Sequence, residues 1–211
     1  NLKIIFDYNL FPALKIISKY GVGLDNIDLE ACKKNKIKVA HTPGVNRLSV
    51  AEQTLCFMIG LTRNIFQSSY KLKQAKWEKI GGYQLSNKTV GIIGVGNIGK
   101  EVVELLKPFN CKILVNDIID QDEYYKKNNL HKVSKEEIYC NSDIITLHVP
   151  LTEKTKNMIN KESISKMKKT AFMINTARGS IVNQNDLIEA LENKMIAGAA
   201  LDVFEEEPIK D

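Results

Sequence analysis

The chain has 211 residues, 44% hydrophobic and 26% charged, which is the composition of a globular protein with length for one or two domains. The net charge of +5 comes from scattered lysines, so we expect no nucleic-acid partner. No stretch is long and apolar enough to span a membrane and no secretory signal opens the sequence, so we expect a cytoplasmic protein. The four cysteines lack the spacing of a metal site, and we expect buried or half-buried thiols: Cys32, Cys56, Cys111 and Cys140.

The beginning of the chain predicts short strands with an incomplete connection. Apolar runs at 1–8 and 13–18 have strand character, but only four residues separate them, too few for the crossover between parallel strands. Either the two runs pair as a hairpin, or the sequence lacks an internal segment after about Asn9. A short helix over 29–34 and a strand over 37–41 follow.

The next region predicts a helix and an amphipathic segment. Ser49 and Glu52 have the spacing of a capping box, which predicts a helix from Ser49 to about Arg63. Residues 66–86 are amphipathic and contain the only tryptophan, Trp77, which we expect to pack in the core.

Residues 89–117 predict a strand, a glycine turn, a helix and a second strand. Apolar residues fill 89–93, a helical apolar pattern covers 100–107, and a further apolar run fills 112–116. Glycines follow the first strand at G-x-G-x-x-G spacing, and an acid ends the second strand: Gly94, Gly96, Gly99 and Asp117. This order is the fingerprint of a dinucleotide-binding unit; the alternative is a βαβ unit without a nucleotide.

Each of these positions has a physical role if a dinucleotide binds. Gly94 allows a tight turn, Gly96 lets a pyrophosphate approach the backbone, and Gly99 lets the helix pack closely on its strand. The helix start offers free N–H groups to the phosphates. Asp117 is placed to accept hydrogen bonds from a ribose 2′-hydroxyl and to repel a 2′-phosphate, while Ile118 supplies no cation, so NAD is favoured over NADP.

Strands and helices alternate through the rest of the chain. A second capping box starts at Ser134 with Glu137. The later elements are expected as strands over 143–147, 171–175 and 197–203 and as helices over 161–168 and 185–193. This alternation predicts an α/β fold, with a doubly wound parallel sheet covered on both faces. Ligands of such sheets bind beyond the carboxyl ends of the strands, so the residues that follow each strand are the candidates for chemistry.

Arg178 is the sharpest of these candidates. It follows a buried strand, and a guanidinium can hold a carboxylate with two parallel hydrogen bonds, which suits a small acid substrate. The structural alternative is an arginine that caps a helix or pairs with a surface acid. Glu207 ends a run of three acids, 205–207, and such runs are usually solvated. His148, Asp202 and Phe204 also follow strands.

Six motifs, in order, resemble those of the D-isomer-specific 2-hydroxyacid dehydrogenases, most closely the D-3-phosphoglycerate dehydrogenase branch. The resemblance runs from about Leu14 to Pro208. Its motifs are YGVGLDNIDLEA, TPGVNRLSVAE, GIIGVGNIGK, SDIITLHVPLT, NTARGSIVN and AGAALDVFEEEP. It implies a Rossmann-type NAD domain beside a smaller, flavodoxin-like substrate domain that is partial in this chain. The implied division is 1–44 for the substrate domain and 45–211 for the NAD domain.

The resemblance also implies roles for individual residues. Arg178 orients the substrate, Glu207 partners the catalytic histidine, and Asp202 lies against the nicotinamide carboxamide. The backbone of Val22 and Gly23 helps to hold the substrate carboxylate. Further positions match contacts to the cofactor: Asn97, Ile98, Asp117, Val149, Pro150, Thr176 and Ala177.

One family motif has no counterpart in the sequence. The catalytic histidine is expected a little more than twenty residues beyond Glu207, whereas the sequence ends at Asp211. None of the three histidines present stands at that position: His41, His131 and His148. We therefore expect a partial sequence that also lacks part of the first domain.

The substrate and the assembly remain open between alternatives. The expected reaction joins 3-phosphoglycerate and phosphohydroxypyruvate, with Lys19 and Arg47 as candidate phosphate-binding cations; glyoxylate or hydroxypyruvate reduction is the alternative. A corepressor-like protein that senses NAD is the non-enzymatic alternative. Phosphite oxidation would require a lysine at Val22. The resemblance implies a homodimer or larger homo-oligomer, with the helix after Ser49 near the interface, and no metal.

Overall fold

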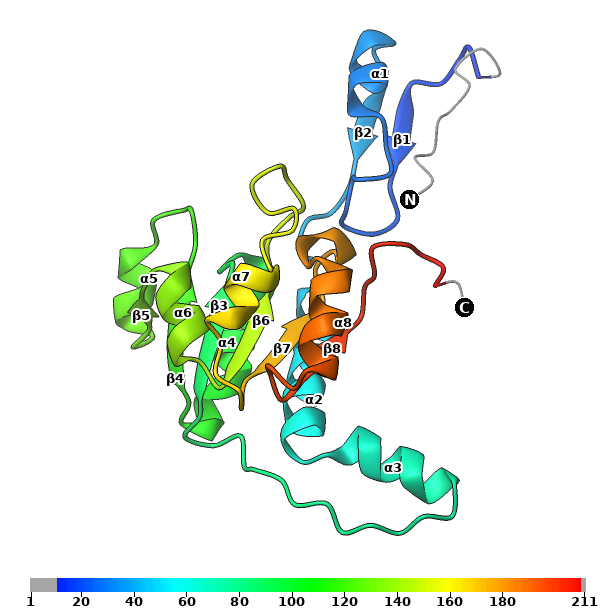
Figure 1. Cartoon of the computed structure of the whole chain (residues 1–211). Helices are drawn as coiled ribbons and strands as arrows, with labels where there is room; N and C mark the ends of the chain where they lie inside the picture. Colours follow the sequence, from blue (N-terminus) through cyan, green and yellow to red (C-terminus); the bar gives the residue numbers. More distant parts are fainter. Residues whose placement is uncertain (1–10, 210–211) are drawn as a thin grey trace. The chain divides into compact units, whose positions relative to one another are not determined.

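The chain divides into two compact units, Asn1–Leu48 and Ser49–Asp211, in a computed structural model that describes residues 11–209 (Figure 1). The predicted domain boundary after residue 44 stays a prediction. Within the described range, no helix is long and apolar enough to cross a bilayer. Across the same residues, no group of three or more His, Cys, Asp and Glu side chains comes together as metal ligands would.

The first unit contains a two-stranded parallel sheet. β1 (Ile16–Ser18) pairs with β2 (Lys38–Ala40), and α1 (Leu29–Lys34) connects them. The Asp28 carboxylate accepts a hydrogen bond from the Ala31 N–H at 2.9 Å, which caps α1 at its start. The strand expected over 13–18 is thus confirmed only in its last three residues. The strand expected over 1–8, with its possible hairpin, lies outside the described residues.

The second unit is built on a six-stranded parallel sheet in the order β5-β4-β3-β6-β7-β8, which confirms the predicted α/β fold. Its strands are β3 (Thr89–Ile93), β4 (Lys112–Asn116), β5 (His131–Lys132), β6 (Ile144–Leu147), β7 (Phe172–Asn175) and β8 (Gly198–Leu201). The chain lays β4 and β5 on one side of β3 and then returns to lay β6, β7 and β8 on the other. The order of strands therefore reverses between β3 and β6, where open α/β sheets bind their ligands.

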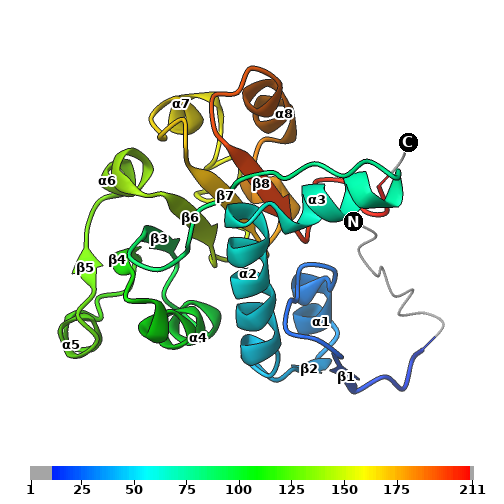
Figure 2. The same cartoon turned by 90° about the horizontal axis from the view of Figure 1, so that it is seen from below.

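Helices cover both faces of this sheet (Figure 2). One face carries α2 (Arg47–Thr62), α4 (Asn97–Leu106) and α5 (Asp122–Lys127); the other carries α6 (Lys135–Asn141), α7 (Lys161–Ser165) and α8 (Gln184–Glu192). Two short 3-10 turns, η1 (Lys107–Phe109) and η2 (Gly179–Ile181), complete the unit. Successive strand residues feed opposite cores: Ile92 packs with α4, whereas Ile93 packs with α6 and α7. Strands that are buried on both faces explain the continuous apolar runs of the sequence.

The capping box at Ser134 is confirmed, but the one at Ser49 is wrong. The Glu137 N–H donates to Ser134 Oγ at 3.1 Å, and the Ser134 N–H donates to Glu137 Oε2 at 2.9 Å. By contrast, α2 begins at Arg47, so Ser49 lies inside its first turn. The Arg47 N–H already donates to the Gly44 carbonyl at 3.1 Å, because the turn over 43–46 continues into the helix.

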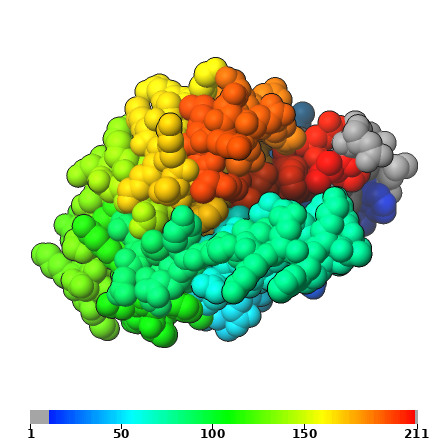
Figure 3. Space-filling model, turned by 60° about the horizontal axis from the view of Figure 1, so that its bottom comes forward, coloured from blue at the N-terminus to red at the C-terminus, as the bar shows by residue number. Residues whose placement is uncertain are grey.

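The segment over 65–88, here called the arm, differs most from the sequence prediction. Figure 3 shows its teal-green atoms at the surface. Only α3 (Ile65–Lys73) is helical, and none of its residues is buried. Trp77, expected in the core, is 81% exposed. Residues 76–84 around it form neither helix nor strand, and all but Ile80 are exposed, so the ring has no packed layer to enter.

Two of the four thiols are also more exposed than expected. Cys32 is buried and Cys111 is half-buried, whereas Cys56 on α2 and Cys140 on α6 are exposed. On α6 the buried positions are Ile138 and Tyr139, so the residue that follows them turns toward solvent.

Candidate functional site

The glycine turn lies at the carboxyl end of β3, beside the point where the strand order reverses. Gly94 has a φ of 97°, which favours glycine, and its N–H donates to the Asn116 carbonyl at 2.9 Å. A Cβ at Gly94 would stand 2.5 Å from the His148 carbonyl oxygen. The turn therefore packs backbone to backbone against the loop that follows β6.

The other two glycines differ in what surrounds them. A Cβ at Gly99 would stand 2.2 Å from the Gly94 carbonyl oxygen, so α4 can pack closely on the turn only with glycine there. A Cβ at Gly96 would meet nothing within 4 Å. Gly96 is thus not required by packing inside the chain, and it leaves open space next to the start of α4.

The start of α4 presents backbone donors to this open space. Gly96 is the N-cap and supplies no side-chain hydrogen bond to the first turn. Asn97 is exposed and Ile98 is half-buried, and the first bond along the helix runs from the Lys100 N–H to the Gly96 carbonyl at 3.0 Å. Free N–H groups at the positive end of a ten-residue helix suit a pyrophosphate.

Asp117 is fixed beside the same turn. Its Oδ2 accepts from the Val95 N–H at 2.6 Å, and its Oδ1 accepts from the Ile119 N–H at 2.9 Å. Gln121 Nε2 donates to the Val95 carbonyl at 3.1 Å and so holds the turn from the other side. Each carboxylate oxygen has a second lone pair, which can accept a hydroxyl donor such as that of a ribose.

The loop after β6 contains a half-buried histidine, His148, whose Nδ1 atom is buried. The His148 Nε2 lies 3.0 Å from Thr146 Oγ1, and burial lowers the pKa of His148 to about 4. The adjacent Val149 contacts the Gly94 position, and the Pro150 carbonyl accepts from Thr155 Oγ1 at 2.6 Å. His148 therefore serves as a neutral packing residue of the loop after β6 and is a poor general base near neutral pH.

We expect His148 to reduce stability in acid. Its folded-state pKa of about 4 lies below the ordinary histidine value of 6.5, so the unfolded chain binds a proton first as the pH falls. This contribution is intact above pH 6.5 and is lost toward pH 4, by about 2 to 3 kcal/mol of unfolding free energy. Urea unfolding at pH 7.5 and 4.5 should show a smaller acid loss for His148→Gln. The control, exposed His131→Gln, should behave as wild type; equal acid losses in all three proteins would contradict the assignment.

Arg178 lies directly beyond β7. Thr176 and Ala177 are buried, and Arg178 is half-buried, with its Nη1 donating to the Ala177 carbonyl at 2.6 Å. This hydrogen bond holds one terminal nitrogen of the guanidinium close to the backbone at the end of β7. The Thr176 Oγ1 lies 3.2 Å from Thr54 Oγ1 on α2, so this helix braces the turn.

Asp202 and Glu207 lie beyond β8. Gln53 on α2 donates from Nε2 to Asp202 Oδ1 at 2.6 Å, a contact between residues 149 positions apart. The Glu207 carboxylate is exposed and accepts from the Phe204 N–H at 2.9 Å, so the acidic run folds back on itself. Sequence spacing gave no signal for Gln53.

The structure brings the predicted site residues together in two groups of the second unit. The glycine turn, Asp117 and Val149 form one group, and the turns after β7 and β8 form the other. Val22 and Gly23 belong to the first unit, where the Val22 carbonyl lies 3.1 Å from His41 Nδ1.

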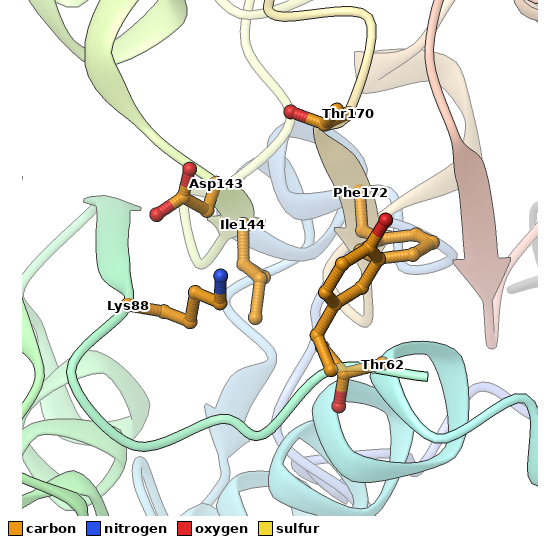
Figure 4. A pocket seen from close by; sticks show the side chains of 7 residues that line it. Thr62, Lys88, Asp143, Ile144, Thr170 and Phe172 are labelled. Carbon is orange, nitrogen blue, oxygen red and sulfur yellow. The ribbon is translucent and has the colours of Figure 1, made fainter. Parts of the chain in front are cut away.

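A cavity of about 130 Å³ lies at the opposite, amino-terminal edge of the sheet (Figure 4). It is lined by Thr62, Tyr83, Lys88, Asp143, Ile144, Thr170 and Phe172. The Lys88 ammonium lies 5.2 Å from the centre of the Tyr83 ring. None of the predicted site residues lines this cavity, so it is separate from the candidate site.

Comparisons with known proteins agree with this geometry. The family model described as "D-isomer specific 2-hydroxyacid dehydrogenase, NAD binding domain" matches residues 55–211. The chain is 41% identical over 206 residues to a D-3-phosphoglycerate dehydrogenase of Bacillus subtilis, covering 97% of this chain and 39% of that protein. It is 42% identical over 205 residues to a glyoxylate reductase of Thermofilum pendens, covering 94% of this chain and 60% of that protein.

The fold is also similar to that of solved structures. The D-lactate dehydrogenase of Aquifex aeolicus, complexed with NAD and lactic acid, matches with a TM-score of 0.86 and 36% identity, over 95% of this chain and 61% of that one. The chain thus spans about two fifths to three fifths of the length of these three proteins.

Proposed function

Because the chain belongs to the D-isomer-specific 2-hydroxyacid dehydrogenases and matches their NAD-binding domain, we propose that the whole protein is an NAD-dependent oxidoreductase. It transfers a hydride between the nicotinamide ring and C2 of a small D-2-hydroxy acid or the corresponding 2-oxo acid. The observation that carries this proposal is the placement of Asp117 on the glycine turn, with open space at Gly96. We assign 1–44 to a substrate domain and 45–211 to the NAD domain.

The residues present fit NAD at one end of the site. A pyrophosphate would be bound by the backbone N–H groups of Gly96, Asn97 and Ile98. The Asp117 carboxylate would accept hydrogen bonds from the hydroxyls of the adenosine ribose. The negative charge of Asp117 disfavours a 2′-phosphate. At the other end, Asp202 takes the nicotinamide carboxamide, and a further set lines the cofactor: Gly94, Gly99, Val149, Pro150, Thr176 and Ala177.

The bound cofactor supplies the hydride chemistry: its oxidised form accepts a hydride and its reduced form donates one. The residues of the chain position the acid and stabilise its charge. The Arg178 guanidinium binds the carboxylate of the acid and favours negative charge on the C2 oxygen during the reaction. In the first unit, the backbone of Val22 and Gly23 is the proposed substrate-binding segment. The Glu207 carboxylate partners the catalytic histidine of the whole protein, stabilises its protonated form and so raises the pKa of that base.

For the substrate we propose 3-phosphoglycerate and phosphohydroxypyruvate, a pair that belongs to serine biosynthesis. The similarity to a D-3-phosphoglycerate dehydrogenase supports this choice, and the similarity to a glyoxylate reductase supports reduction of glyoxylate or hydroxypyruvate as the alternative. Lys19 and Arg47 are the proposed phosphate-binding cations. Lys19 is half-buried after β1, and Arg47 is the exposed first residue of α2.

The test is NADH absorbance at 340 nm with the full-length protein, offered phosphohydroxypyruvate, hydroxypyruvate, glyoxylate and pyruvate in parallel. We expect loss of NADH with phosphohydroxypyruvate, at a higher kcat/KM than with the other acids. A preference for glyoxylate or hydroxypyruvate would keep the dehydrogenase and replace its substrate. Tight NADH binding without turnover of any acid would overturn the proposed enzyme and favour a protein that senses NAD.

We also propose that the protein is a cytoplasmic homodimer that associates through the arm. The arm exposes six large apolar side chains between residues 65 and 83, and such groups of exposed apolar residues often mark an interface. They are Ile65, Phe66, Tyr70, Leu72, Trp77 and Tyr83. A second copy of the chain is the proposed partner, since a twofold interface pairs one patch with itself. The four cysteines are free, which supports a reducing compartment.

We expect the double substitution Trp77→Ser and Leu72→Ser to convert the dimer to a monomer. These side chains are 81% and 57% exposed, so their removal leaves the core of the unit unchanged. Light scattering after size exclusion gives the mass, and far-UV circular dichroism reports the fold. Ile118→Ser is the control, because Ile118 is 99% exposed but lies outside the arm. A wild-type monomer, or a dimer that survives the double substitution, would contradict the proposed interface.

A further inference from the structure

A fully buried asparagine ends β7, directly before the turn that carries Arg178. Asn175 has no exposed surface, although its neighbours on the strand are apolar. Burying an amide without partners costs free energy, so its hydrogen bonds indicate why it is there.

Both ends of the Asn175 amide bind the backbone of the turn. The Ala177 N–H donates to Asn175 Oδ1 at 3.0 Å, and Asn175 Nδ2 donates to the Arg178 carbonyl at 2.9 Å. The Ala177 N–H needs an acceptor, and the Arg178 carbonyl needs a donor. Only an amide of this length meets both needs: aspartate would place a carboxylate against the Arg178 carbonyl, and leucine would bind neither group.

The backbone of Asn175 also connects this turn to the end of β8. The Asp202 N–H donates to the Asn175 carbonyl at 3.0 Å, continuing the pairing of Asn175 with Leu201 in the sheet. Beyond Arg178, a Cβ at Gly179 would stand 1.9 Å from the Phe204 carbonyl oxygen. The two turns are therefore in backbone contact on both sides of Arg178.

We propose that Asn175 is a positioning residue: its side chain fixes the turn that carries Arg178, and its backbone carbonyl pairs the start of this turn with the backbone of Asp202. The inference rests on the proposed function, because Arg178 and Asp202 are there assigned to the acid and to the carboxamide. The relative placement of these two groups sets the distance between the bound acid and the nicotinamide. Asn175 touches neither ligand and acts through the turn.

The experiment compares Asn175→Asp with Asn183→Asp in the full-length protein. Asn183 caps α8 by accepting from the Asp186 N–H at 3.1 Å, and an N-cap needs only an acceptor, so the same substitution is neutral there. For Asn175→Asp we expect kcat/KM for the oxo acid to fall about 100-fold, with a raised KM. Hydrogen exchange of a peptide that covers 176–182 should become about tenfold faster. NADH affinity should change less than about tenfold, because the adenosine end is held elsewhere.

Each outcome decides the inference. Asn175→Ser, which can both donate and accept but is shorter, should show a smaller loss and also provides the measurement if the aspartate variant does not fold. A lower melting temperature with normal kcat and KM below it would overturn the inference and leave Asn175 as a purely structural residue. Equal losses in Asn183→Asp would also overturn it. If the wild-type protein reduces no acid, the proposed function fails, and unchanged exchange in 176–182 would then overturn the role of Asn175.

Discussion

Replacing Arg178 with alanine is expected to lower kcat/KM for the oxo acid by about 30- to 4,000-fold, the cost of about 2 to 5 kcal/mol for removing one partner of a desolvated charge pair. The guanidinium lies beyond β7, where its Nη1 is already held by the Ala177 carbonyl. It is thus oriented before the acid binds. NADH affinity should change little, because the glycine turn and Asp117, the proposed cofactor site, do not involve Arg178.

Two further substitutions separate charge from geometry in this result. Arg178→Lys retains the positive charge but loses the planar pair of donors, and we expect an intermediate loss with a raised KM. Arg63→Ala removes an exposed arginine one position beyond the end of α2 and should leave the kinetics unchanged. NADH titration by fluorescence provides the binding control. Loss of NADH affinity as large as the loss of turnover would place Arg178 in the scaffold of the fold.

The second large effect is expected from a pair of glycines that differ only in their surroundings. Gly96→Val should weaken NADH binding by about 100-fold, since its side chain fills the space next to the helix start. Its melting temperature should stay close to that of wild type, because a Cβ there meets nothing within 4 Å.

Gly99→Ala should show the opposite balance. Its Cβ would stand 2.2 Å from the Gly94 carbonyl oxygen, so α4 must move away from the turn. We expect a loss of about 1 to 3 kcal/mol of unfolding free energy, or about 2 to 12 °C in melting temperature. Calorimetry and NADH titration on both variants check the pair. A Gly96→Val protein that is unstable, or one that binds NADH normally, would contradict the proposed pyrophosphate site.

The sequence predicted the central unit of the fold because its signals are local. The three glycines of the motif are only a few residues apart: Gly94, Gly96 and Gly99. The strand before them and the helix after them each have a clear apolar pattern. A short-range pattern also identified the capping box at Ser134. The same local pattern at Ser49 gave a wrong helix start. The turn before Arg47 continues directly into α2, and the Arg47 N–H already donates to the Gly44 carbonyl.

The features that the sequence did not reveal depend on long-range contacts or on missing ones. Gln53 meets Asp202 only because α2 lies against the sheet, and 149 positions separate the two residues. Asn175 could be predicted as a strand end, but not as the group that closes the turn. Aromatic residues generally prefer the core, but Trp77 is 81% exposed. The sequence alone does not show that no other part of the described chain packs over this position.

The shortness of β5 affects how the protein resists aggregation. This edge strand has only two residues, His131 and Lys132, both exposed, and Lys132 forms ion pairs with Asp120 and Asp122. A long, apolar edge would offer unpaired backbone groups to strands of other molecules, whereas a short charged edge offers few. At crowded concentrations the sheet is therefore protected from growing by strand addition along this edge.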